Sequence, residues 1–181
     1  MSGINFRNIT FWLVPFVAFS LTGCGLTQSV AEGSKSAFNS VFYKQIKVLH
    51  LDFTAREALN TDSREMNSLS EPVVVRVYQL KASQAFEKIV YEQLLRDGEN
   101  SLKEDLLATR DVVVKPGGDA MLDMPLEAGA KFVGIAGLFR EPDRKNNHWK
   151  LIIKRESLFV NNARIIELGA NSLRLLPAKE E

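Results

Sequence analysis

The chain has 181 residues, of which 45% are hydrophobic and 25% charged, an ordinary composition for a globular protein rather than a disordered or fibrous one. Its 23 basic and 22 acidic side chains give a formal net charge of +1, so the charge offers no footprint for nucleic acid or for an acidic ligand. A single cysteine, Cys24, excludes an intramolecular disulfide, and the fold must therefore depend on its hydrophobic core.

The first 23 residues have the layout of a secretory signal peptide. A basic side chain precedes the apolar run Ile9–Leu21, and small residues follow before Cys24. A membrane-spanning helix needs about 20 apolar residues, whereas this run is shorter and contains Pro15. Residues 1–23 are therefore expected to be a cleaved signal, and Leu21-Thr-Gly-Cys24 resembles a bacterial lipobox. The alternative is an ordinary signal peptide with a chance cysteine beside the cleavage site.

In a lipobox the cysteine becomes the first residue of the mature protein and carries the lipid. Cys24 is thus the expected lipidation site, and no cofactor other than this covalent lipid is expected. Two or more acyl chains anchor a protein stably to a membrane, whereas a single chain binds only marginally. Gly25 stands where an aspartate commonly retains lipoproteins at the inner membrane. This resemblance implies an outer-membrane lipoprotein that faces the periplasm, with residues 24–43 as a tether.

Two β-strands are expected near the start of the folded domain, which we place at residues 44–181. The stretch Gln45–Phe53 is rich in β-forming residues, and Pro72 stands directly before Val73–Leu80, at a position where strands tolerate proline. The intervening residues Arg56–Glu71 are polar and lack strand periodicity. Connections longer than about 12 residues are uncommon in compact domains and are often functional, although a solvated connection is the simpler interpretation.

A helical insert is expected next, at about residues 82–108. Apolar side chains recur there at the spacing of one helical face, namely Phe86, Ile89, Val90 and Leu94. Asp97-Gly98 predicts the end of this helix, and Ser101 with Glu104 has the spacing of a capping box that would begin a second helix. Such an apolar stripe is typical of a core face rather than of a ligand pocket.

The rest of the chain is expected to form short strands that are separated by turns. These strands are expected at residues 111–115, 120–126, 131–140, 149–154, 158–161, 164–168 and 172–176. The stretch Pro116-Gly-Gly-Asp119 is a strong turn signal between the first two of them. Many short strands with such punctuation indicate a mostly β protein and favour a β-sandwich.

The sequence contains few of the residue patterns that are typical of catalytic sites. His50 and Asp52 share one face of a strand, where they could ligate a metal or relay a proton, but no third ligand accompanies them. His148 stands beside Trp149 at a strand start and is expected at the surface. Motifs of the GxSxG, HExxH, P-loop and GxGxxG types are absent from the sequence. We therefore expect a protein that is not an enzyme and has no metal site.

Several stretches of the chain together form the pattern of one family. They are the lipobox, Val73–Leu80, the Phe86–Leu95 helix, Glu104–Leu107, Lys115–Gly117, and Phe132–Arg140 with Trp149. Their order and spacing, over about residues 45–177, resemble the outer-membrane lipoproteins of the type VI secretion system, the TssJ/SciN family. The resemblance implies a transthyretin-like sandwich of two antiparallel sheets, with a short helical insert between strands.

The same resemblance implies a role and a partner. The protein would be a subunit of the type VI secretion membrane complex, and its first inter-strand loop would dock on the periplasmic domain of the large inner-membrane component. Neither nucleic acid nor a small-molecule substrate is expected. The residues expected in this loop are Arg56, Glu57, Leu59, Asn60, Asp62, Arg64, Glu65, Met66 and Leu69. Apolar side chains on a polar loop are natural interface anchors, so Leu59, Met66 and Leu69 are expected to contribute affinity and the charged residues orientation.

One alternative belongs to a different class of protein. A lipoprotein with a β-sandwich could instead bind cell-wall glycan or an exported client chain, the latter by strand addition at an edge such as Ser172–Leu176. A clustered aromatic surface would favour glycan binding, whereas loop-dependent capture of a protein would favour the adaptor. A lipid-anchored hydrolase is disfavoured because the sequence offers no nucleophile–base pair.

Overall fold

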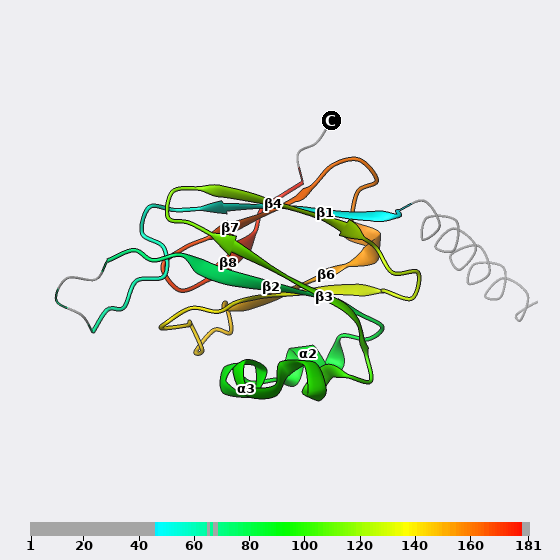
Figure 1. The fold of residues 1–181 in the computed structure, drawn as a ribbon, viewed down its shortest axis with the longest axis horizontal. Coiled ribbons are helices and arrows are strands. Elements are labelled where there is room, and N and C mark those ends of the chain that lie inside the picture. The colour runs from blue at the N-terminus through cyan, green and yellow to red at the C-terminus, as the bar shows by residue number, and fades with distance from the viewer. Residues whose placement is uncertain (1–45, 65, 67–68, 179–181) are drawn as a thin grey trace, which may run out of the picture. The chain divides into compact units, whose positions relative to one another are not determined.

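The computed structural model describes residues 46–64, 66 and 69–178, and these form two four-stranded β-sheets packed face to face (Figure 1). The first sheet has the strand order β4-β1-β7-β8, and the second sheet has the order β3-β2-β5-β6. The strands are β1 Val48–Ala55, β2 Val73–Leu80, β3 Leu106–Val114, β4 Asp119–Pro125, β5 Phe132–Gly137, β6 Lys150–Lys154, β7 Arg164–Leu168 and β8 Leu173–Leu175. The expected mostly β, two-sheet sandwich is therefore confirmed.

Strand pairing within the described residues is antiparallel except between β1 and β7. Leu51 of β1 lies opposite Leu122 of β4 on one side and opposite Arg164 of β7 on the other. A parallel pair needs a long crossover connection, and here the chain builds the whole second sheet between β1 and β7. The first and last parts of the domain thus become neighbours in one sheet.

Alternating side chains along the strands fill the space between the sheets. In β1, Leu49, Leu51 and Phe53 are buried, whereas His50 and Asp52 point to the opposite face of the sheet. Their buried neighbours from other strands, the helices and the loops form one continuous hydrophobic core, whose largest members include Tyr78, Phe86, Leu94, Ile135 and Trp149.

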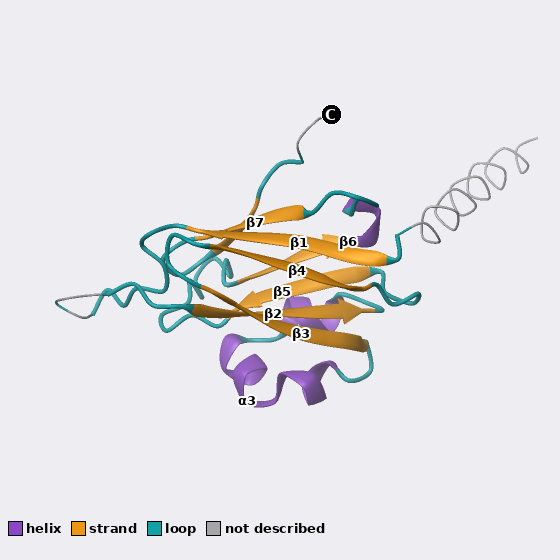
Figure 2. Cartoon of the chain, turned by 45° about the horizontal axis from the view of Figure 1, so that its top comes forward, coloured by secondary structure: helices purple, strands orange, loops and turns teal. Residues whose placement is uncertain are grey.

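The helical insert covers the outer face of the second sheet (Figure 2). It consists of α2 (Gln84–Lys88) and α3 (Tyr91–Leu102). The Phe86 ring lies over Gly134 of β5, where a Cβ would come within 3.0 Å of the ring, so glycine leaves room for the helix. The Lys150 ammonium of β6 donates to the carbonyl oxygens of Phe86, Glu87 and Ile89 at 2.9, 2.8 and 2.7 Å, and thereby caps the end of α2.

Several sequence-based expectations about secondary structure are wrong. Phe86, Ile89, Val90 and Leu94 do not share one helical face, because α2 ends at Lys88, α3 begins at Tyr91, and Val90 between them is 58% exposed. The helix break expected at Asp97-Gly98 is present as a kink in α3, since Asp97 has a non-helical φ of −156° and ψ of 42°.

The helical segment after this kink already includes Ser101 and ends at Leu102, so Ser101 does not begin a helix, and Leu106 instead pairs with Leu80 as the first residue of β3. The helical insert consequently ends at Leu102 rather than near residue 108. Residues 158–161, expected as a strand, follow the short 3₁₀ helix η1 (Arg155–Ser157) as irregular chain.

Buried hydrogen bonds explain that irregular corner. The Arg155 guanidinium is 3% exposed and donates to the carbonyl oxygens of Glu127, Ala130 and Ile46 at 2.7, 2.9 and 3.0 Å. A buried charge needs such partners, and holding Arg155 among three carbonyl groups turns the chain away from the β6 direction.

Candidate functional site

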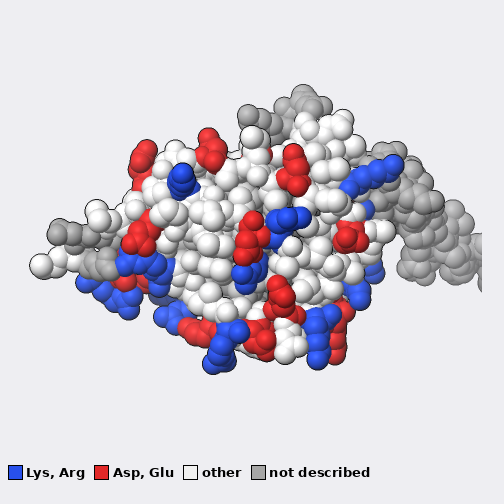
Figure 3. Space-filling view, viewed as in Figure 1, with Lys and Arg blue, Asp and Glu red and all other residues white. Residues whose placement is uncertain are grey.

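The connection between β1 and β2, residues 56–72, projects beyond the ends of both sheets (Figure 1, Figure 2). It contains the loop that the sequence analysis expects to bind a partner. Figure 3 shows acidic and basic side chains interspersed over the viewed face, with white atoms at the far end of this loop. We call residues 56–63 and 70–72 the loop base, and residues 64–69 the loop tip.

The loop base begins with a firm attachment to the first sheet. The Arg56 backbone N–H donates to the carbonyl oxygen of Leu168 at 3.0 Å, and its guanidinium donates to Glu167 Oε1 at 2.8 Å. Arg174 of β8 donates to the same oxygen at 2.7 Å. The hydrogen bonds from Arg56 and Arg174 lower the pKa of Glu167, which keeps the carboxylate ionised between its two partners.

Glu57 lies against the turn between β3 and β4. Gly117 in this turn has φ of 63°, and a Cβ at this position would collide with the Glu57 carboxylate. Glycine therefore serves both the turn geometry and the close approach of the loop. The Gly117 N–H also donates to the Arg56 carbonyl oxygen at 3.2 Å, so this turn supports the loop base from a second direction.

Leu59 and Asn60 tie the loop base to the interior. Leu59 is 0% exposed and belongs to the hydrophobic core. Asn60 has φ of 50° and is 4% exposed; its amide donates to the Pro72 carbonyl oxygen at 3.0 Å, and its Oδ1 accepts from the Arg140 N–H at 2.8 Å. The Arg140 guanidinium also pairs with Glu71 at 3.3 Å. The expectation that Leu59 is an interface anchor is therefore wrong, because the core takes up its side chain.

A second pair of contacts joins the loop base to the connection between β5 and β6. The Ser63 N–H and hydroxyl both donate to Glu141 Oε2, at 2.9 and 2.7 Å, and these bonds lower the pKa of Glu141. Asp62 accepts from Nε and the backbone N–H of Arg64, at 2.8 and 3.0 Å, and these hydrogen bonds hold the pKa of Asp62 well below its usual range. Asp62 and Ser63 thus fix the point at which the loop tip leaves the loop base.

The loop tip presents apolar side chains to solvent. Met66 is fully exposed and Leu69 is 72% exposed. The Arg64 side chain is 71% exposed beside them, with its charge paired to Asp62. Two large apolar side chains at the end of a projecting loop are typical of a protein interaction surface, because a partner that covers them removes their apolar area from water. Glu65, which the sequence analysis also assigned to this loop, lies outside the described residues.

Each of the two histidines lies beside one carboxylate in this structure. His50 Nδ1 is 2.6 Å from Asp123 Oδ1 of β4 rather than paired with Asp52. His148 Nδ1 is 3.1 Å from an Asp143 carboxylate oxygen. In the described part of the chain, no three His, Cys, Asp or Glu side chains gather closely enough to hold a metal ion.

The expected lipid anchor falls outside the described residues. The signal peptide at residues 1–23, Cys24, Gly25 and the tether to residue 43 all precede residue 46, so they remain predictions from the sequence. No helix in the described ranges is long and apolar enough to cross a membrane.

Comparison with known proteins identifies the family. A family model described as the type VI secretion lipoprotein (VasD, EvfM, TssJ) matches residues 47–171, more than two thirds of the chain. The chain belongs to this family. None of the curated proteins compared matches it significantly.

Solved structures contain similar chains. A chain of a structure described as a type VI membrane complex is 43% identical to this lipoprotein, with a TM-score of 0.68, over 73% of this chain and 99% of that one. A chain of a structure described as the C-terminal domain of the type VI secretion protein TssM from EAEC is 42% identical, with a TM-score of 0.66, over 74% and 100%. The lipoprotein TssJ1 from Pseudomonas aeruginosa is 20% identical, with a TM-score of 0.58, over 74% and 98%.

The likeness to TssJ1 confirms the sandwich fold that the sequence resemblance implied for this type VI secretion lipoprotein. Sequence reasoning missed the residues that hold its loop base, above all Glu141 and Glu167. They lie 78 and 111 positions from their partners Ser63 and Arg56, so no local pattern connects them. Only Asn60 carried a local signal, because asparagine is one of the few residues that readily adopt positive φ.

Proposed function

We propose that this type VI secretion lipoprotein is held at the outer membrane by acyl chains on Cys24 and binds the periplasmic C-terminal domain of TssM through its loop tip. The lipobox and the glycine at position 25 support the location. The chains that are 43% and 42% identical support the partner, because their structures are described as a type VI membrane complex and a TssM C-terminal domain.

The observation that carries the proposal is the exposed pair Met66 and Leu69 at the end of a loop whose base is fastened to both sheets. Binding costs conformational entropy when flexible segments must be ordered. The contacts of Arg56, Asn60 and Ser63 hold the loop base before any partner arrives, so less ordering remains for the complex. The apolar side chains of the loop tip supply affinity, and the paired charge of Arg64 supplies orientation.

The lipid anchor favours this interaction because it holds the protein near its partner. Acyl chains on Cys24 would keep the sandwich close to the membrane surface. Tethering raises the local concentration of the loop tip near an envelope-spanning partner, and occupancy then does not require a very tight interface. The protein thus acts as an adaptor that joins the outer membrane to the secretion complex.

Capture from solubilised envelopes tests the proposed partner site. We expect the mature lipoprotein to recover one large inner-membrane protein, identified by mass spectrometry as TssM, from cells that express the secretion system. Met66→Ser with Leu69→Ser should remove this recovery. Val113→Ser with Leu95→Ser is the matched control, because these side chains are also exposed, at 57% and 50%, but lie on β3 and α3. Undiminished recovery by the loop-tip variant sinks the proposal.

Membrane fractionation tests the anchor separately. Cys24→Ser should move the protein out of the outer-membrane fraction, because no acyl chain can then be attached, while the folded domain still captures the partner in solution. A Cys24→Ser protein that remains in the outer-membrane fraction would contradict the lipidation site.

A further inference from the structure

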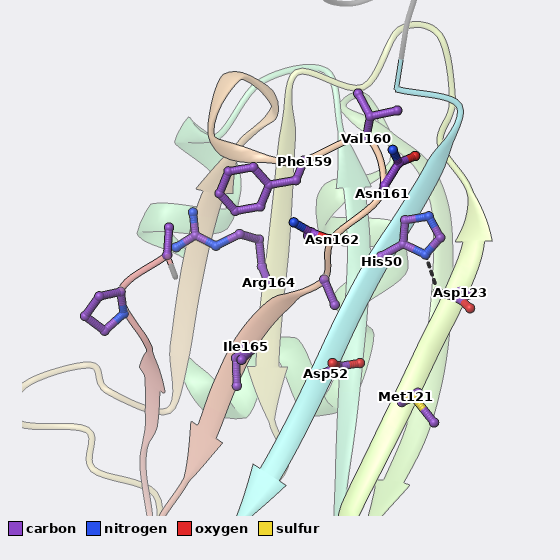
Figure 4. Close-up of a pocket in the computed structure, with 13 residues that line it drawn as sticks. His50, Asp52, Met121, Asp123, Phe159, Val160, Asn161, Asn162, Arg164 and Ile165 are labelled. Carbon is purple, nitrogen blue, oxygen red and sulfur yellow. Dashed lines mark hydrogen bonds and ion pairs between the residues drawn. The ribbon is translucent and has the colours of Figure 1, made fainter. Parts of the chain in front are cut away.

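The outer face of the first sheet is hollowed beside the start of β7 (Figure 4). Within the described part of the chain, the helical insert covers the second sheet and leaves this face of the first sheet without a helix over it. The hollow has a volume of about 980 Å³ and lies among β1, β4, β7 and the irregular chain that precedes β7. It lies away from the loop tip, since its β1 residues His50 and Asp52 are near the start of that strand and the loop follows the end of it.

One side of the hollow is lined by polar groups. Asp52 is half-buried between Met121 of β4 and Ile165 of β7, its register neighbours, and its carboxylate has no hydrogen-bond partner among the described residues. His50 is held by Asp123 through Nδ1, which leaves Nε2 without a partner in the same part of the chain. The lining therefore offers carboxylate oxygens and an oriented imidazole to a ligand that carries hydroxyl groups.

The opposite side of the hollow carries a fixed aromatic ring. Phe159 is 37% exposed, and the Arg164 guanidinium lies 5.5 Å from the centre of its ring. Arg164 is itself held by the carbonyl oxygens of Ser157 and Leu176, at 2.9 and 3.3 Å. The ring is thus supported by a side chain that cannot easily move away. Asn161, an exposed amide, also lines the hollow and lies beside His50 (Figure 4).

We infer that this hollow binds a neutral oligosaccharide that carries hydroxyl and acetamido groups, the chemistry of bacterial cell-wall glycan strands. A sugar ring has an apolar C–H face that packs on an aromatic face such as Phe159, and a rim of hydroxyl groups that donate to Asp52 and bond with Asn161. The methyl group of an acetamido substituent finds apolar contact at Met121, which is 79% exposed. The lining of the hollow therefore contains both an aromatic ring and polar groups, which such an amphipathic ring requires.

The charge and shape of the hollow disfavour other ligands. The carboxylates of Asp52 and Asp123 both line it, whereas the guanidinium of Arg164, which also lines it, is already held by two carbonyl oxygens. An anionic ligand would therefore meet like charge from the carboxylates. An extended peptide that joins a sheet needs a free strand edge, whereas this hollow lies on the face of the sheet over β1 and β7. A glycan bound here leaves the loop tip free, so the adaptor could hold the cell wall and the secretion complex at once.

The inference is tested by measuring the affinity of the mature lipoprotein, in detergent, for chitotetraose by titration calorimetry. We expect saturable binding that is absent with cellotetraose, which has the same backbone without acetamido groups. Phe159→Ala and Asp52→Ala should each weaken binding by about tenfold or more, because each removes one wall of the site. The loop-tip variant Met66→Ser with Leu69→Ser should bind chitotetraose like the wild type, which separates this site from the proposed partner site.

Sedimentation with purified cell-wall sacculi tests whether the protein binds the glycan strands or the peptide stems of the cell wall. Co-sedimentation that chitotetraose competes, and that both hollow variants lose, supports a glycan site. Sedimentation without binding of chitotetraose would mean that peptide stems are recognised, and it would overturn the inference. So would absence of binding to either probe, or binding that is unchanged in both variants. Asn161→Ala, at an exposed position, provides a third variant if either of the others fails to fold, as judged by circular dichroism.

Discussion

The loop base and the loop tip are neighbours in sequence but use their side chains in different ways. In the loop base, Leu59 is part of the core and Asn60 bonds to groups in two other segments. In the loop tip, the side chains of Met66 and Leu69 are exposed and do not belong to the core. The base therefore contributes to folding, and the tip is left for binding.

One loop can thus be held in place by its base and still present its tip for binding. An apolar residue in a polar loop has two possible destinations, the core of its own domain or the surface of a partner, and either removes its apolar area from water. Leu59 and Leu69 are the same residue type ten positions apart, yet they reach opposite destinations. Substitutions in the two parts should consequently separate stability from partner capture.

The largest loss of stability is expected from Leu59→Ala. Truncating a buried leucine usually costs about 2–5 kcal/mol, since it removes apolar contacts and leaves a cavity. Urea denaturation followed by circular dichroism would measure the free energy of unfolding. Leu69→Ala is the matched control and should leave that free energy nearly unchanged. Equal effects of the two substitutions would remove the distinction between base and tip.

A smaller loss is expected from Asn60→Ala, at about 1–3 kcal/mol, because two hydrogen bonds of a buried side chain are lost and alanine resists positive φ. Asn60→Gly removes the same bonds but adopts this φ without strain, so it should be less damaging than alanine. Thermal unfolding of both variants provides the comparison. If glycine proves the worse of the two, backbone conformation is not what asparagine supplies here.

A pH-dependent loss is expected from the contact between Ser63 and Glu141. Because the pKa of Glu141 is lower in the folded protein than its ordinary value of 4.5, the unfolded chain binds more protons in acid. This contribution is complete above about pH 4.5 and is lost as the pH falls through the folded pKa. Glu141→Gln should reduce stability at neutral pH and flatten its decline in acid. Ser63→Ala should do the same, and a slope that stays as steep in both variants would refute the assignment.

The smallest effect on stability is expected at the loop tip. Met66→Ser with Leu69→Ser should change the free energy of unfolding by about 0.5 kcal/mol or less, because neither side chain is buried. The same variant should lose at least about tenfold in affinity for the partner, since truncated interface anchors dominate binding losses. Titration of the variant against the captured partner measures this affinity. A destabilised tip variant would show that the tip packs on the domain after all.

Most of the strands could be predicted from local sequence patterns. Val73–Leu80 and Arg164–Leu168 coincide with β2 and β7, since β-branched residues and flanking turn signals act locally. The sequence also indicated helical periodicity around Phe86, but not where the helix ends. Leu106 has no local feature that reveals its pairing with Leu80, so the capping-box spacing at Ser101 was misleading.

For the candidate site, the sequence determined that a polar connection with a few apolar residues separates β1 from β2. Only the tertiary structure decided that Leu59 belongs to the core while Met66 and Leu69 remain outside. Likewise, nothing local placed Phe159 opposite His50 and Asp52 around one hollow. Periodicity and turn chemistry arise from neighbouring residues, whereas burial and the walls of a site arise from contacts between segments far apart in the chain.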